Sequence, residues 1–143
     1  MNCIIAYMIK IKGVNFMNKN VMKKWVKALR SGKYKQGQRV LKQTNGEGKT
    51  VHCCLGVLCE LYNDQMRKNK KKTLSEKIQH GIHYINKCDE KLPEIVKEWA
   101  DMNDNLGWFC DQNDRDNCLS DLNDDGKKFK TIANIIEKNW ENL

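Results

Sequence analysis

Residues 51–62, VHCCLGVLCELY, constrain the fold most, because this run is apolar enough to require a buried position. Its apolar residues recur at helical spacing up to Tyr62, so we predict a core helix that ends near Asn63. A chain of 143 residues is the right length for one domain around a single core of this kind.

The same segment places His52, Cys53, Cys54 and Cys59 close together, which raises two chemical hypotheses. Structural zinc sites usually take paired ligands such as Cys-x₂₋₄-Cys; Cys-x₂-Cys is absent here, and Cys54 and Cys59, separated by four residues, lie on the predicted helix. Cys53 or Cys54 could instead be a nucleophile at a helix N-terminus, with His52 as the base. We favour buried, reduced thiols that pack as small hydrophobes, and so predict no metal, cofactor or catalytic residue here.

Periodicity elsewhere predicts further helices and one hairpin. Residues 19–31 place Val21, Met22, Trp25, Val26 and Leu29 on one helical face. Residues 39–43 and 49–53 are β-prone and flank the turn sequence NGEG. Residues 92–102 and 129–140 predict two more helices, and a short element with an Asp-Gly turn precedes the last one. Residues 64–90 are ambiguous, a weak helix or a strand after Gly81.

The predicted fold class is therefore α+β. We expect a single small domain, residues 17–143, with about four helices packed on a short antiparallel β-hairpin or small sheet. Residues 1–16 are expected to be an N-terminal extension, upstream of a working start at Met17 or Met22. No apolar run reaches the roughly 20 residues of a membrane helix, and the start lacks a signal-peptide pattern. The sequence thus indicates an intracellular protein without a membrane partner.

Charge is distributed unevenly along the chain. Residues 1–60 contain twelve Lys or Arg against two Glu, whereas residues 101–143 contain five against ten Asp or Glu. The net charge of +8 is therefore concentrated in the N-terminal part, where it could steer an anionic ligand. In the acidic part, DLNDDG (residues 121–126) imitates half of a calcium loop, but no late Glu completes it, and we predict an Asx-type turn.

Residues 30–41, RSGKYKQGQRVL, are the most informative stretch for a ligand. Glycines allow close backbone approach, cations can hold a phosphate, and the tyrosine can stack on a base or ribose. His52 or Trp108 could add another side chain that contacts the ligand. The candidate ligand-binding residues are Arg30, Lys33, Tyr34, Lys35, Gln36, Gly37, Arg39, His52 and Trp108. An ordinary lysine-rich connection explains the same residues equally well.

Four ordered blocks, WVKALRSGKYKQ, CCLGVLC, LPEIVKEW and LNDDGKKF, resemble a family of small proteins encoded by bacteriophages and prophages. In that family a Ser commonly precedes the final Phe, and Lys128 replaces it here, so the last helix lacks a capping hydroxyl. The resemblance implies a small phage accessory protein in the cytoplasm of an infected bacterium, and it transfers no catalytic residues.

The leading hypothesis is a non-enzymatic phage protein that binds and sequesters a phosphate-bearing small molecule, such as a nucleotide-derived immune signal, to counter host defence. The first alternative is an inhibitor that contacts a host defence protein through the acidic C-terminal third. The second is a Cys-dependent hydrolase. Nucleic acid remains open as a partner, and a homodimer would suit a pocket shared between subunits.

Overall fold

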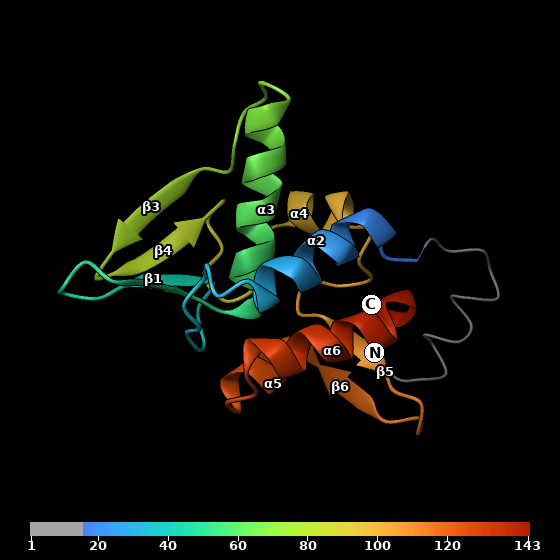
Figure 1. Ribbon diagram of the computed structural model, residues 1–143. Helices are drawn as coiled ribbons and strands as arrows, with labels where there is room; N and C mark the ends of the chain where they lie inside the picture. Colours follow the sequence, from blue (N-terminus) through green and yellow to red (C-terminus); the bar gives the residue numbers. More distant parts are fainter. Residues whose placement is uncertain (1–15) are drawn as a thin grey trace.

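The computed structural model describes residues 16–143 and confirms the α+β class (Figure 1). Five α-helices lie in the described residues. They are α2 (Lys19–Arg30), α3 (Cys54–Lys68), α4 (Glu94–Trp99), α5 (Leu119–Asp124) and α6 (Phe129–Asn139), followed by a 3₁₀ turn, η1 (Trp140–Asn142). The expected extension lies almost wholly outside the described range. Met17, the expected first residue of the domain, is already in the core at 1% exposure.

The strands form two antiparallel sheets. The larger has the order β2-β1-β4-β3, and the smaller is the β5–β6 hairpin. Their bounds are β1 (Lys42–Thr44), β2 (Thr50–His52), β3 (Glu76–Gln79), β4 (Ile82–Ile85), β5 (Trp108–Cys110) and β6 (Asp116–Cys118). The larger sheet lies on one side of α3, and α2 packs between α3 and α6 on the other (Figure 1).

Helix α2 forms as the period predicts. Asn18 caps it, because its side-chain oxygen accepts hydrogen bonds from the backbone amides of Asn20 (3.0 Å) and Val21 (3.1 Å). All five predicted apolar residues of this helix are buried. Trp25, fully buried, donates from its ring nitrogen to the carbonyl of Cys54 at 2.9 Å, which ties α2 to the start of α3.

Helix α3 also forms where predicted but continues to Lys68, one turn beyond the expected end. Gly56 lets this helix approach the chain before β1, since a Cβ there would overlap the backbone carbonyl of Leu41. Leu41 is itself fully buried, and its carbonyl accepts a hydrogen bond from the Cys53 amide at 3.2 Å. Close packing of α3 against the backbone of Leu41 therefore requires a glycine at position 56.

Two hairpins differ from the sequence prediction. In the ambiguous region, the strand after Gly81 is confirmed as β4, but its partner β3 is not predicted because all four of its residues are exposed. His80 and Gly81 both have positive φ, +51° and +79°, as a tight two-residue hairpin turn requires. The β5–β6 hairpin falls in a polar stretch without an alternating apolar pattern. Polar strands of only three or four residues are too short to show a hydrophobic period in the sequence.

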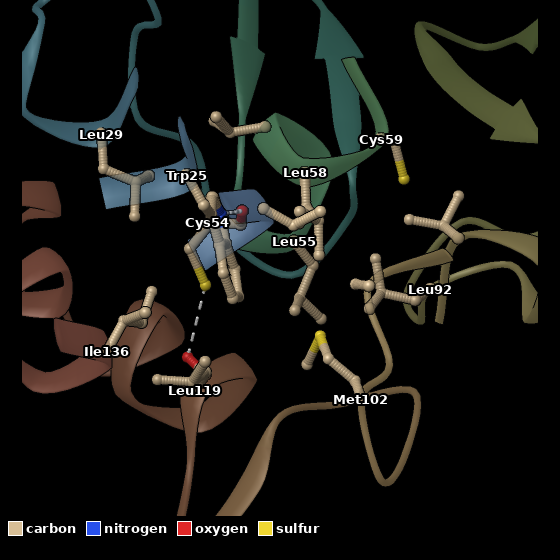
Figure 2. Close-up of a cluster of buried hydrophobic side chains, with 14 of the residues drawn as sticks. Trp25, Leu29, Cys54, Leu55, Leu58, Cys59, Leu92, Met102, Leu119 and Ile136 are labelled. Atoms are coloured by element: carbon tan, nitrogen blue, oxygen red, sulfur yellow. Dashed lines mark hydrogen bonds between the residues drawn. The ribbon is translucent and has the colours of Figure 1, made fainter. Parts of the chain in front are cut away.

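The core lies where α2, α3 and α6 meet (Figure 2). Figure 2 shows Cys54, Leu55 and Leu58 of α3 directed among side chains from Trp25, Leu92 and Ile136. The predicted stripe of α6 is buried at Phe129, Ile132, Ala133 and Ile136. The DLNDDG segment departs from prediction, since its first four residues end helix α5 and the turn is confined to Asp125 and Gly126 (φ +92°).

Candidate functional site

The three clustered cysteines belong to the core. Cys54 and Cys59 are at most 1% exposed, and burial raises their pKa well above the usual 9.0. Burial also raises the pKa of Cys53 to about 11, although this residue caps α3 and its sulfur accepts the Gly56 amide at 3.4 Å. Desolvation thus outweighs the helix-terminus effect on which the nucleophile hypothesis depended.

The described cysteines differ in their state. Cys53, Cys54, Cys59, Cys88 and Cys118 are free, whereas Cys110 is in a disulfide. Between residues 16 and 143, no group of three or more His, Cys, Asp and Glu side chains is arranged to hold a metal ion. Over the same range, no helix is long and apolar enough to cross a membrane.

His52 and His83 belong to a polar network that the sequence analysis missed. The strand register places Lys42 opposite His52 and Thr44 opposite Thr50 on one face of the sheet. His83 contributes from β4, Glu76 from β3 and Glu60 from α3. The sequence did contain a signal for this network. Polar residues occupy alternate positions of the strands, on the face that would normally be buried and apolar.

Lys42 is the centre of this network. Its amino group is 3.0 Å from carboxylate oxygens of both Glu60 and Glu76. Each carboxylate also binds a histidine: Glu60 contacts Nε2 of His52 at 3.0 Å, and Glu76 contacts Nδ1 of His83. The hydrogen bond from His52, supported by Lys42, lowers the pKa of Glu60 to about 2. Nearly all polar groups of these side chains are paired with one another. The network therefore holds α3 on the sheet, and few of its polar groups are left to bind a ligand.

The predicted loop lies at the C-terminal end of α2, between that helix and the start of α6. Tyr34 packs its ring against the edge of His52, with centroids 5.2 Å apart, and Lys33 holds its amino group 5.2 Å from the tyrosine centroid. Burial raises the pKa of Tyr34. The fold thus brings Lys33, Tyr34 and His52 next to one another, although His52 is held in the Lys42 network.

Other candidates serve the fold. Gln36 accepts the Phe129 amide (3.0 Å) and donates to the Lys127 carbonyl (2.7 Å), so its side chain caps α6 from another part of the chain. This bond replaces the cap that Lys128 cannot supply. Gly37 packs against Val51, and the Arg39 backbone (φ +72°) donates to Asp124 at 2.7 Å.

Trp108 lies apart from the loop. It is the first residue of β5, in the hairpin on the far side of α6 in Figure 1, and it lines none of the cavities beside the loop.

A cavity of about 490 Å³ lies beside this loop and is the candidate functional site. It is lined by residues 29–32, 34–36 and 128–130. Four candidate ligand-binding residues lie on it: Arg30, Tyr34, Lys35 and Gln36. Lys128 and Lys130 are contributed by the acidic C-terminal third and were not predicted, since only the fold brings them to the loop.

The electrostatics of this cavity favour an anion. Lys35, Lys128 and Lys130 form no ion pair with any described residue. Arg30 pairs with Glu137 at 3.1 Å, but both side chains are more than a third exposed, so a ligand could displace that contact at little cost. The N-terminus of α6 also faces the cavity, and helix N-termini attract negative charge.

A second basic cavity adjoins the first. It has a volume of about 300 Å³, and its lining includes Lys24, Lys27, Lys33 and Lys68 around Tyr34. Ser31 and Tyr34 line both cavities, so Tyr34 stands between them with lysines on either side.

Residues 17–140 match the model of one protein family. The chain belongs to the DUF8296 family, a domain of unknown function. No curated protein and no solved structure shows significant similarity to it. The DUF8296 match covers most of the chain and includes all four sequence blocks quoted above.

Those four blocks converge in the structure of this DUF8296 chain. Asn123, fully buried, accepts hydrogen bonds from the Cys54 amide (3.1 Å) and the Gln36 side chain (3.1 Å), and it donates to the Gly37 carbonyl (2.8 Å). The remaining block supplies Trp99, whose ring packs edge-on against Tyr62 of α3. Many residues of these blocks therefore form the scaffold that positions the basic loop.

Proposed function

We propose that this protein binds a phosphate-bearing small molecule in the cavity between the loop after α2 and the N-terminus of α6. The observation that carries the proposal is the convergence there of Lys35, Lys128 and Lys130 from distant parts of the sequence, all without ion pairs to described residues. Uncompensated cations around a concave surface attract anions more strongly than cations on an open surface do.

The cavity suits a ligand the size of a nucleotide. Its volume of about 490 Å³ falls within the usual range of small-molecule sites, roughly 300–1,000 Å³. Lysine and arginine side chains would hold the phosphates, backbone amides at the start of α6 would add hydrogen bonds, and Tyr34 would contact a base or ribose. Gln36 supports the site by holding α6 in place.

The proposed role is binding without turnover. The described lining supplies cations, a tyrosine and backbone groups, which together suffice to hold a phosphate. The resemblance to phage-encoded proteins suggests a use for such binding, which is the sequestration of a nucleotide-derived signal of host defence. A released ligand would then be chemically unchanged.

Calorimetric titration with inorganic tripolyphosphate at low salt tests the proposal. We expect saturable binding, and we expect Lys128→Glu to weaken it at least about tenfold, because one attractive charge becomes a repulsive one. Ligand recovered after denaturing the complex should still be tripolyphosphate, whereas release of orthophosphate would contradict binding without turnover.

Lys72→Glu is the matched control, since it makes the same change in net charge at an exposed position in the loop between α3 and β3. Its affinity for tripolyphosphate should stay near that of the wild type. If Lys72→Glu and Lys128→Glu weaken binding equally, the effect is one of net charge and the assigned cavity is wrong.

A further inference from the structure

A separate cavity of about 350 Å³ lies between α6 and the β5–β6 hairpin. Its apolar part is formed by Phe109, Leu122 and Ile135. Its polar part combines carboxamides, from Gln112 and Asn117 on the hairpin and Asn134 and Asn139 on α6, with the charged side chains of Asp111, Arg115 and Lys138. None of its lining residues lines the proposed phosphate cavity, although the two sites are linked where Arg30 of that cavity donates to Asn134 of this one.

Asn139 is the strongest indication that this cavity takes a ligand. The residue is only 7% exposed, and its side-chain nitrogen donates to the Ile135 carbonyl at 2.8 Å. Its oxygen accepts no hydrogen bond from a described residue, and Asn139 lines the cavity. A nearly buried amide thus presents a free acceptor to this space.

Two neighbouring carboxamides, on the exposed Asn134 and the half-buried Asn117, also have a polar group left to bind a ligand. Asn134 accepts from Arg30 at 2.6 Å, which leaves its side-chain nitrogen as an available donor. Asn117 donates to the carboxylate of Asp111 at 3.0 Å, which leaves its oxygen as an available acceptor. Asp111 also accepts from the backbone amides of Asn113 (2.8 Å) and Arg115 (3.0 Å), so the hairpin loop is fixed before any ligand arrives.

We infer that this cavity binds the base of a nucleoside. The free N–H groups of Asn134 and the free oxygens of Asn117 and Asn139 together offer a donor and acceptors, the groups with which Asn and Gln side chains pair with the edge of a nucleobase. The apolar floor would contact the face of the base, whereas a sugar would present hydroxyl groups that this floor cannot satisfy.

Side-chain amide signals in ¹H–¹⁵N NMR spectra test the inference directly. Adenosine, guanosine, cytidine and uridine would be titrated separately, with glucose as the comparison ligand. We expect at least one nucleoside to shift the Asn134 and Asn139 amide signals saturably. Thr131→Trp, which places a ring in the cavity from an exposed position, should weaken this binding at least about tenfold.

Asp121→Trp is the matched control, since it adds the same ring on an exposed position of α5 that does not line the cavity. It should leave nucleoside affinity unchanged, and thermal unfolding would verify that both variants fold. Gln112→Ala, on the exposed hairpin loop, provides a second variant that should also weaken binding.

Three results would overturn the inference. The first is that no nucleoside shifts these signals at up to about 10 mM, a range that includes even weak specific binding. The second is that glucose shifts them as strongly as the nucleosides do. The third is that Thr131→Trp and Gln112→Ala both bind as the wild type does. The tripolyphosphate titration is unaffected by each result, so failure here is distinguishable from failure of the proposed phosphate site.

Discussion

Single residues in this protein often serve the packing where their chemistry first suggested a ligand. Gln36 has the side chain of a base-binding residue, but it caps α6 and donates to Asn123 at 3.1 Å. Cys54 has a nucleophilic atom, but it is fully buried and its sulfur faces the Leu119 carbonyl at 3.7 Å. The type of a residue limits which chemical roles its side chain can have. The residues packed around that side chain determine which of those roles is still possible.

Gly56 provides a direct test at the residue scale. Gly56→Ala should lower the free energy of unfolding by about 3 kcal/mol or more, because the added Cβ would overlap backbone that cannot move aside easily. Urea unfolding followed by circular dichroism would measure the change. Gly46→Ala is the matched control, since a Cβ there meets nothing within 4 Å, and it should change stability by less than about 0.5 kcal/mol. Equal effects would refute the close-packing role of Gly56.

At the scale of elements, a polar network joins the larger sheet to α3, beside the buried Ile85 that β4 contributes to the core. Lys42 bridges Glu60 of α3 to Glu76 of β3, and the flanking histidines complete the chain of contacts. The Glu60 and Lys42 side chains are only 18% and 17% exposed, so solvent screens their contact weakly. Such an arrangement makes the attachment of the sheet sensitive to pH.

Acid unfolding should expose the role of Glu60. Its pKa is about 2 in the folded protein against the usual 4.5, so it contributes stability above pH 4.5 and loses it as the pH falls toward 2. The loss over this window should amount to at most about 3 kcal/mol. In Glu60→Gln, urea unfolding at a series of pH values should lack this part of the dependence. Glu47→Gln, whose pair with Lys49 is fully open to solvent, should retain it.

At the scale of the whole molecule, folding rearranges the charge seen along the sequence. The C-terminal third carries a net charge of −5, yet its Lys128 and Lys130 join the basic loop that follows α2. Asn123 helps to hold this junction, because it connects α5 with both the loop and the start of α3. The basic cavity therefore depends on one buried amide between distant segments.

Replacing that amide should weaken the whole fold. Asn123→Ala removes three hydrogen bonds and leaves buried groups of Cys54 and Gly37 unpaired, so the free energy of unfolding should fall by about 3–5 kcal/mol. Asn20→Ala, at an exposed position of α2, is the matched control and should change it by less than about 0.5 kcal/mol. Thermal and urea unfolding would measure both, and a loss no larger than that of the control would refute the role of Asn123.

The sequence by itself determined the α+β class, helix α2 with its buried face, the burial of CCLGVLC and the stripe of α6. In each of these segments the apolar residues repeat with the period of the element, so the information is local. It also identified the basic loop as a chemical candidate, whereas the fold places His52 in the Lys42 network and on none of the cavities beside the loop.

Only the tertiary structure decided which distant residues meet. The β3 and β5–β6 strands are short and polar, so their pairing is set by contacts and not by a hydrophobic period. The Lys42 network, the arrival of Lys128 and Lys130 at the loop, and the carboxamide cavity all depend on segments far apart in the chain. A local pattern shows which face of an element is buried. It does not show which partner covers that face, because the partner is selected by the packing of the complete chain.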